Sequence, residues 1–209
     1  LLVPAMLGAA LLFALLLDTP RLRLGGFSRL AIFLPYAVPA VVASLVWGFR
    51  HLPTGSPCYF LLEKAGIGGP DLLHGNGLFV ALANIAVWGG TGFNMIVIYT
   101  SLRAIPAELY EAARLDGARA PALLFRIILP LLRPVIAVAL VVRGIDAARA
   151  FDTILIQTNG GPQSASETMS LLIYRTMIRF GDPGLASAMG TIYLLAMLAV
   201  AFFAVATIW

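Results

Sequence analysis

The sequence predicts an all-α integral membrane protein, and three observations lead to this prediction. Of 209 residues, 60% are hydrophobic and only 11% are charged, with a mean hydropathy of +0.93, whereas soluble domains carry about 25% charged residues. The apolar residues form long runs, as bilayer-spanning helices do. The runs lack the apolar–polar alternation of membrane barrel strands. Helices are therefore the structure that satisfies the backbone in lipid.

Five apolar segments are expected to be the membrane helices. They are Leu1–Leu17, Ala31–Phe49, Leu78–Leu102, Leu129–Val142 with an extension to about Ala150, and Leu185–Ile208. Crossing the hydrocarbon takes about 20 helical residues, so the first segment is short. No basic region precedes it and no small-residue cleavage site follows it, which favours a membrane helix over a signal peptide. We expect six helices in the native protein, five of them in this piece, within one transmembrane domain over residues 1–209.

The distribution of basic residues predicts the orientation. Asp18–Leu30 and Arg103–Arg126 together carry seven arginines, against four Lys or Arg residues in the alternate connections. Because basic loops stay in the cytoplasm, the loop over residues 103–126 is expected there. The long connection Arg50–Gly77 is rich in Gly and Pro, which predicts irregular structure. Its two histidines, His51 and His74, are expected to be solvated.

A charged, helix-forming segment stands between two of the apolar runs. It has the pattern EAA-x3-G-x9-I-x-L-P, formed by Glu111, Ala112, Ala113, Gly117, Ile127, Leu129 and Pro130, with Asp116 just before the glycine. Alanine favours helix, acidic residues suit a helix start, and a glycine suits a helix end. The pattern predicts a short amphipathic helix that could fit a groove on a partner. An ordinary loop with a chance Glu-Ala-Ala triplet would not keep all seven fixed positions.

Ionisable residues occur in and after the fourth apolar segment. They are Arg143, Asp146, Arg149 and Asp152. Such residues are costly in a membrane and usually face a bundle interior or a watery cavity. Arg143 and Asp146 share a helix face because they are three residues apart. Two interpretations stay open: a structural ion pair, or the lining of a translocation cavity that binds solute hydroxyls.

The chain resembles the MalF/UgpA-type permease subunits, the EAA-motif membrane components of bacterial carbohydrate ABC importers. Besides the Glu-Ala-Ala segment, the resemblance lies in Phe33–Pro39, Ser101–Glu111, Phe151–Ile154, Thr158–Pro162, Glu167–Thr168 and Tyr174–Arg175. It implies the ABC type I importer permease fold. It also implies alternating access coupled through the EAA loop to a separate ATPase, in the import of a sugar or a glycerol-phosphate-type solute across the bacterial inner membrane.

The resemblance also implies partners and contacts. The expected partners are a second related permease, an ATP-binding cassette ATPase dimer, an extracytoplasmic solute-binding protein and the lipid bilayer. The implied solute contacts are Gly89, Gly90, Phe93, Arg143, Asp146, Ala147 and Asp152. Asn84, Trp88 and Asn94 are further candidates. No cofactor is expected on this chain, since ATP and Mg belong to the ATPase, and the sequence has no Gly-x4-Gly-Lys-Ser/Thr phosphate loop.

Three other functions fit the sequence less well. A secondary transporter driven by an ion gradient would use a buried carboxylate such as Asp146, but would leave the EAA pattern unexplained. A membrane enzyme is disfavoured because no metal-ligand set or nucleophile–base pair is recognisable. A nucleic-acid partner is disfavoured despite the net charge of +4, because the basic residues form no continuous patch.

Overall fold

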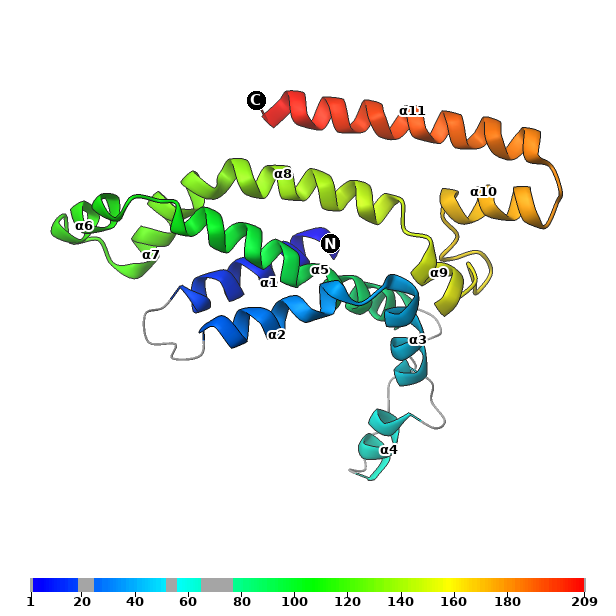
Figure 1. Cartoon of the computed structure of the whole chain (residues 1–209), viewed down its shortest axis with the longest axis horizontal. Coiled ribbons are helices and arrows are strands. Elements are labelled where there is room, and N and C mark those ends of the chain that lie inside the picture. Colours follow the sequence, from blue (N-terminus) through cyan, green and yellow to red (C-terminus); the bar gives the residue numbers. More distant parts are fainter. Residues whose placement is uncertain (1, 19–24, 52–55, 65–76, 209) are drawn as a thin grey trace.

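The computed structural model describes residues 2–18, 25–51, 56–64 and 77–208, and in these ranges the chain forms helices and no strand (Figure 1). The helices are α1 (Leu2–Leu17), α2 (Gly25–Ala37), α3 (Ala40–His51), α4 (Pro57–Lys64), α5 (Gly77–Arg103), α6 (Ala107–Leu115), α7 (Ala120–Leu123), the π-helical turn η1 (Leu124–Ile128), α8 (Leu129–Ala148), α9 (Asp152–Gln157), α10 (Met169–Ile178) and α11 (Pro183–Ile208).

Helix α5 is the centre of the fold. It packs against α1, α2 and α8 along its length, and against α3 and α9. The apolar core lies where α1, α5 and α8 meet, and consists of Ala10, Ala14, Leu17, Met95, Ile98, Leu102 and Leu132. Small residues on α1 let that helix approach α5 closely, as in other membrane helix pairs. The core therefore connects the middle of the molecule to the end at which α6 lies.

Three of the five expected membrane helices are confirmed. Among the described residues, Gly77–Arg103, Ala120–Ala148 and Pro183–Ala206 are long and apolar enough to cross a bilayer. The second of them begins before the expected Leu129, because α7, η1 and α8 form a continuous rod. Helix α1 agrees with the first expected segment, but its 16 residues extend for only about 24 Å, less than the hydrocarbon thickness of about 30 Å.

The prediction of one helix over Ala31–Phe49 is wrong. The chain forms α2 and α3 here, and they meet at an angle of 94°. The physical reason is Pro39, because a proline disfavours helical geometry in the residue before it and donates no backbone hydrogen bond. Helix α2 ends at Ala37, where the Val38 amide donates to the Pro35 carbonyl at 3.2 Å. If this bent pair forms one span, the described residues contain four.

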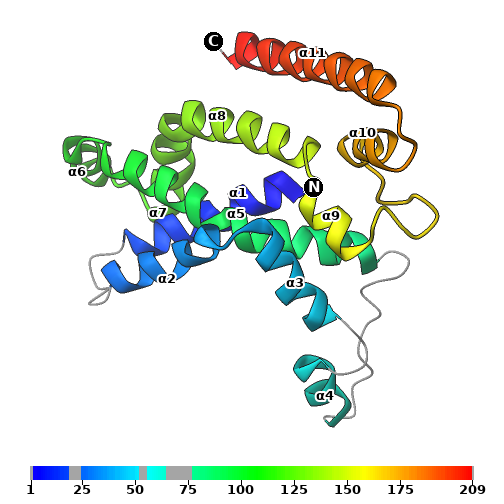
Figure 2. The ribbon, with the colours of Figure 1, turned by 45° about the vertical axis from the view of Figure 1, so that its right-hand side comes forward.

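The remaining helices lie at the edges of the molecule. Figures 1 and 2 both show α11 beside α8 and α10, while α3 and α4 extend away from the bundle. The connection that was expected to be irregular therefore contains a short helix, α4. His51 is 1% exposed, so its predicted solvation is wrong: it lies at the end of α3, where its ring packs against Trp47. His74 lies outside the described residues.

Candidate functional site

The EAA segment forms the short helix that its sequence predicts. Helix α6 follows Pro106, whose carbonyl accepts from the Leu109 amide at 3.2 Å, and it carries Glu108 in its first turn and Arg114 in its last. These charges complement the helix dipole. Figure 1 shows α6 at one end of the molecule, beyond the ends of α5 and α8. The helix therefore lies at the surface, at one end of the molecule.

Gly117 ends α6 by a backbone conformation that glycine alone adopts without strain. Its φ is +78°, in the left-handed region. The Gly117 amide donates to the Arg114 carbonyl at 3.0 Å, and the Ala118 amide donates to the Ala113 carbonyl at 2.9 Å. These two bonds form a Schellman motif, which satisfies the last carbonyls of the helix. The predicted role of Gly117 as the helix end is confirmed.

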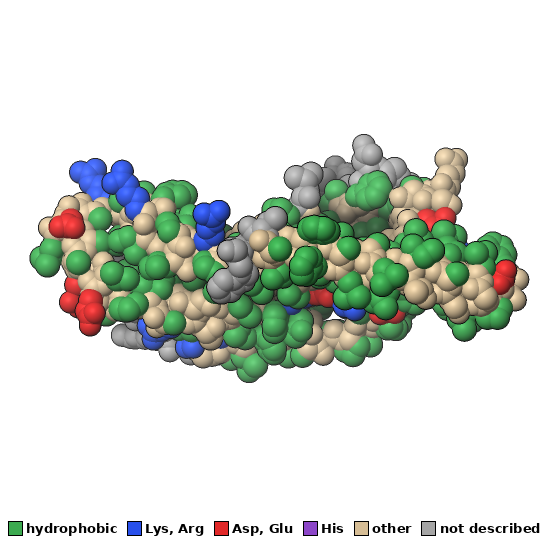
Figure 3. Space-filling view, turned by 90° about the horizontal axis from the view of Figure 1, so that it is seen from above, with side chains coloured by type: hydrophobic (Ala, Val, Ile, Leu, Met, Phe, Trp, Pro, Cys, Tyr) green, Lys and Arg blue, Asp and Glu red, His purple; other side chains and the backbone are tan. Residues whose placement is uncertain are grey.

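The EAA residues divide between an exposed face and the connection to α8. Ala113 is buried, whereas Leu115 is 89% exposed. Glu111, Ala112, Asp116 and Gly117 are exposed as well. Ile127 lies in η1, Leu129 begins α8, and Pro130 follows in its first turn. Figure 3 shows charged side chains gathered at this end, whereas hydrophobic and uncharged atoms cover most of the middle of that face.

Charged and aromatic side chains surround the base of α6. Arg103, at the end of α5, donates to Asp18 at 3.5 Å, and its guanidinium lies 6.0 Å from the Tyr99 ring, which Arg29 approaches to 4.9 Å. Tyr110 of α6 has a buried hydroxyl without a hydrogen-bond partner among the described residues. Its pKa is raised above 10.0 by burial and, secondarily, by the Asp18 carboxylate. The Tyr110 phenol therefore stays neutral at physiological pH.

A cavity of about 630 Å³ lies near the bend between α2 and α3. Its wall combines residues from α1, α2, α3, α5, α8 and α9. Six of the seven residues predicted to contact solute line it: Gly89, Gly90, Arg143, Asp146, Ala147 and Asp152. The structure thus brings together predicted contacts from three helices, α5, α8 and α9. Among the described residues, no group of three or more His, Cys, Asp or Glu side chains could hold a metal ion.

Arg143 is the most constrained charged residue of the cavity. Its side chain is 13% exposed, and its Nε donates to Asn94 Oδ1 at 3.3 Å. The guanidinium lies 5.0 Å from the Phe93 ring and 5.8 Å from the Tyr36 ring. These two rings stack at 4.9 Å, and cation–π contacts of this kind favour a guanidinium over an aromatic face. Arg143 therefore joins α8 to α5 and α2.

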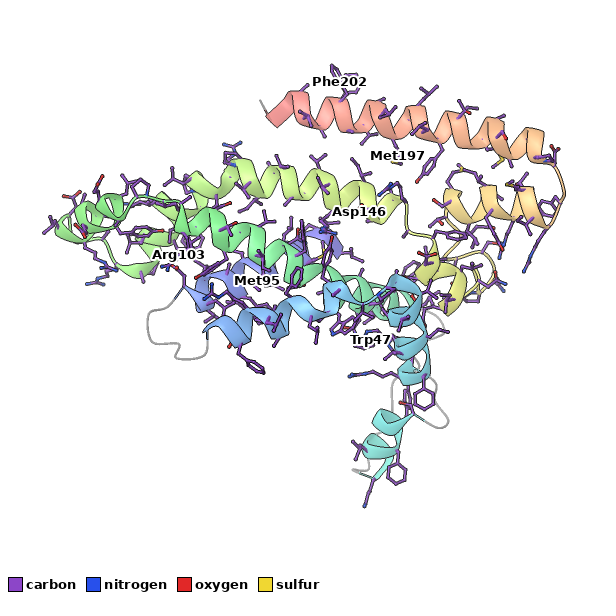
Figure 4. All side chains as sticks on the ribbon, in the orientation of Figure 1. Trp47, Met95, Arg103, Asp146, Met197 and Phe202 are labelled. Carbon is purple, nitrogen blue, oxygen red and sulfur yellow. The ribbon has the colours of Figure 1, made fainter. Side chains whose placement is uncertain are left out.

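Asp146 is shared by two arginines. Its Oδ2 accepts from Arg143 at 3.1 Å and its Oδ1 accepts from Arg149 at 3.1 Å. Arg149 is 64% exposed and, like Asp146, lines the cavity. Figure 4 places Asp146 toward one end of α8 and Arg103 toward the α6 end of α5. The structural ion pairs are present, and the same residues line the cavity. The binding of solute hydroxyls in this cavity stays a prediction.

Three glycines of α5 shape the approach of neighbouring helices. A Cβ on Gly89 would meet no atom within 4 Å, so this position leaves room in the cavity. A Cβ on Gly90 would lie 2.3 Å from Met6 Sδ of α1. A Cβ on Gly92 would lie 2.3 Å from the Ile32 carbonyl oxygen and 2.8 Å from Phe33 Cα. Helices α2 and α5 can therefore pack backbone to backbone only at a glycine.

Some cavity residues escaped the sequence prediction. Tyr36, Pro39 and Thr153 line the cavity, and all three fall within the motifs Phe33–Pro39 and Phe151–Ile154, which were the available signal. Phe93 is absent from the lining and instead supports Arg143.

Two of the further cavity candidates, Asn94 and Trp88, have packing roles. Asn94 is 1% exposed and donates to the Gly90 carbonyl at 2.8 Å. Trp88 packs edge-on against Trp47, and neither it nor Asn84 lines the cavity. Asn94 therefore acts through Arg143, as an interhelical hydrogen bond, and has no place in the wall.

The turn after α9 is held against α10. Asn159 and Gly160 have positive φ angles of 46° and 78°, as the Asn-Gly-Gly-Pro sequence predicts for a turn. Arg175 of α10 donates to the Asn159 carbonyl and to Glu167. The Thr168 hydroxyl caps α10 by accepting from the Leu171 amide at 3.4 Å, and it donates to the Ala150 carbonyl at 3.1 Å. This segment therefore fixes the end of α8 that carries Arg149.

Residues 7–208 match the family described as "Binding-protein-dependent transport system inner membrane component". The chain belongs to this family. The EAA helix and the cavity are thus features of a family member, and the all-α fold and the resemblance stated from the sequence are confirmed.

Three relatives are named as permease proteins of solute transport systems. The chain is 37% identical over 177 residues to the trehalose/maltose transport system permease protein MalF of Thermococcus litoralis, covering 84% of this chain and 59% of that protein. It is 34% identical to the sulfoquinovosyl glycerol transport system permease protein SmoG of Agrobacterium fabrum, covering 91% and 62%. It is also 34% identical to the sn-glycerol-3-phosphate permease protein UgpA of the same organism, covering 94% and 67%.

A solved structure has the same fold. A chain of a bacterial ABC transporter involved in the import of the acidic polysaccharide alginate superposes with a TM-score of 0.82 at 22% identity, covering 99% of this chain and 76% of that chain. The present chain spans 59 to 67% of the length of the three relatives named above.

Proposed function

We propose that the chain is the permease subunit of an ATP-driven, binding-protein-dependent importer of a polyhydroxylated solute such as a sugar or a glycerol-phosphate-type compound. The cavity between α2, α3, α5, α8 and α9 would hold the solute. Helix α6 would dock on a separate ATPase. The named relatives are permease proteins of transport systems for trehalose and maltose, sulfoquinovosyl glycerol, and sn-glycerol 3-phosphate. These solutes support a small hydroxylated solute for the present chain.

The proposal rests on one observation: helices α5 and α8 connect the cavity to α6. Helix α5 carries Gly89 and Gly90 in the cavity wall and ends at Arg103, beside α6. Helix α8 begins at Leu129, inside the EAA pattern, and reaches the cavity at Arg143. Both helices share the core that contains Met95 and Leu132. A displacement of α6 would therefore be transmitted to the cavity by two packed helices, as alternating access requires.

The proposal includes the partners and the location. A second related permease would complete the translocation path, and an ATP-binding cassette ATPase dimer, which holds ATP and Mg, would bind α6. A solute-binding protein would deliver solute on the opposite side. The protein would cross the bacterial inner membrane several times with the EAA loop in the cytoplasm. The excess of basic residues in residues 18–30 and 103–126 supports this orientation.

No observation favours an ion-gradient mechanism. That alternative depended on Asp146 as a carboxylate that takes up a proton or cation. Asp146 already accepts from two arginines at 3.1 Å each. Both carboxylate oxygens are therefore occupied, and the two neighbouring positive charges would repel a further cation, so the site is poorly suited to reversible cation binding.

The test is ATP-dependent uptake by the full-length protein, reconstituted with its partner subunits and binding protein in vesicles. We expect uptake of labelled solute to require ATP and to resist a protonophore. Gly117→Val should reduce uptake at least about tenfold while membrane insertion stays normal, because a β-branched residue at positive φ is strained by roughly 1–2 kcal/mol or more.

The control is Gly8→Val, since a Cβ at Gly8 or at Gly117 meets no atom within 4 Å and only Gly117 has a positive φ. Normal uptake by Gly117→Val would contradict the assignment of α6 as the coupling helix. Uptake that collapses with the protonophore while ATP remains would contradict the ATP-driven mechanism.

A further inference from the structure

We propose that the transported solute carries an anionic group besides its hydroxyl groups, and that Arg149 is the residue that binds this group. The inference rests on the proposed function, since it assigns chemistry to the same cavity. It follows from three features of the wall: the number of charges around Asp146, the free donors of Arg149, and the polar groups of α9.

The cluster of Arg143, Asp146 and Arg149 carries an excess positive charge. One carboxylate serves two guanidinium groups, with one oxygen for each. The carboxylate therefore neutralises only one of the two cations. A guanidinium that shares its only carboxylate with another cation attracts a further anion. Asp152 also lines the cavity but, among the described residues, forms no ion pair with either arginine. The cluster thus leaves room for a second anion.

The two arginines differ in what they can offer to a solute. Arg143 is committed to Asp146, to Asn94 and to the faces of two aromatic rings, and it is 13% exposed. Arg149 is 64% exposed and uses only one terminal nitrogen, at 3.1 Å from Asp146. A guanidinium has five N–H donors in a planar fork that suits carboxylates, phosphates and similar groups. Arg149 is therefore the side chain with donors to spare.

The part of the wall that α9 forms suits hydroxyl groups. Asp152 and Thr153 of α9 line the cavity. Thr153 Oγ1 lies 3.2 Å from the Ser44 hydroxyl, which also donates to the Ala40 carbonyl at 2.7 Å. Thr153 Oγ1 therefore keeps a lone pair that can accept from a solute hydroxyl, as the Asp152 carboxylate can. Asp152 would repel an anion, which places the anionic group at Arg149. The wall thus matches a solute with an acidic end and a hydroxylated end.

The experiment compares neutral and acidic solutes in matched pairs. The full-length protein, assembled with its partner subunits in lipid nanodiscs without the binding protein, is titrated with glucose and glucuronate, trehalose and trehalose 6-phosphate, and glycerol and glycerol 3-phosphate. The readout is the solute concentration that half-saturates the shift in melting temperature. We expect the acidic member of at least one pair to act at about tenfold lower concentration or better, as a charge-assisted hydrogen bond provides.

Variants identify the residue responsible. Arg149→Gln should remove the preference for the acidic member, and Arg149→Lys should retain part of it, because the charge stays while the planar fork is lost. Arg179→Gln is the matched control, since Arg179 is also exposed but lies at the end of α10, outside the cavity lining. It should leave the preference unchanged.

Three outcomes would overturn the inference: an equal or stronger effect of the neutral members, an acidic preference that persists in Arg149→Gln, or no effect of any solute. ATP hydrolysis tests the proposed function separately.

If the binding protein delivers a neutral sugar and the assembly then hydrolyses ATP faster, the assembly is an importer. That result refutes only the claim that the solute is acidic. An assembly without ATP-driven uptake of any solute refutes the function itself.

Discussion

The EAA helix and the cavity are built in opposite ways. Helix α6 and its end are formed by consecutive residues, from Pro106 to Ala118, and bonded almost entirely among themselves. The cavity takes its wall from helices that are distant in sequence, so that Tyr36 of α2 lies close to Arg143 of α8. The EAA helix is thus exposed and local, whereas the cavity is assembled from distant segments.

This difference predicts how each region responds to change. A local helix end depends on a few backbone bonds and on one glycine conformation, so substitutions there should alter docking more than stability. An assembled cavity depends on close helix contacts, and interiors packed to high density respond to the addition of even a single methyl group. The following substitutions separate the two kinds of construction.

The largest effect is expected for Gly92→Ala. The added Cβ would lie within 3 Å of two backbone atoms of α2, and backbone cannot move aside as a side chain end can. We expect the unfolding free energy to fall by about 1–3 kcal/mol, measured as a lower melting temperature of the purified full-length protein.

Gly89→Ala is the control for Gly92→Ala, because it lies on the same helix with no atom within 4 Å of the new Cβ. Its melting temperature should match that of the unchanged protein, or exceed it through the higher helix propensity of alanine. Equal destabilisation by the two variants would show that α2 and α5 do not meet at Gly92.

A smaller, pH-dependent effect is expected at Tyr110. Burial, with the Asp18 charge as the second cause, raises the pKa of this phenol above 10.0. The folded protein then keeps a proton that the unfolded chain has released, so its stability falls as the pH rises above about 10 and through the folded pKa. Tyr110→Phe should reduce this loss and leave stability near pH 7 unchanged or slightly higher, because the buried hydroxyl has no partner in the described chain.

Melting temperatures between pH 8 and pH 11 measure the effect. Identical profiles for Tyr110→Phe and the unchanged protein would mean that the Tyr110 phenol does not contribute to the stability of this end.

The smallest effect on stability is expected for Leu115→Ser. Leu115 is so exposed that its truncation should change the unfolding free energy by less than about 0.5 kcal/mol. Docking should respond instead, since a leucine contact of about 1 kcal/mol corresponds to roughly fivefold in affinity for the ATPase. Binding of the purified ATPase measures this, with Leu185→Ser as the same change at the other end of the molecule. Undiminished binding would exclude Leu115 from the docking surface.

The sequence by itself determined what depends on neighbouring residues. Length and apolarity predicted the helices Gly77–Arg103 and Pro183–Ile208, because a backbone in lipid must bond within its own segment. The EAA pattern predicted α6 and the role of Gly117, since capping and φ are decided within one turn. The resemblance named seven predicted solute contacts, of which six line one cavity, though it gave no account of how they meet.

Only the tertiary structure decided which helix faces meet. The break of Ala31–Phe49 into α2 and α3 brings Tyr36 onto Phe93 and closes the wall around Arg143. His51 is buried because α3 packs against α9, although its sequence surroundings indicate a solvated loop. Composition fixes how much apolar surface must be covered. The pairing of faces depends on contacts between residues far apart in sequence, such as the close approach at Gly92, and no local pattern specifies these.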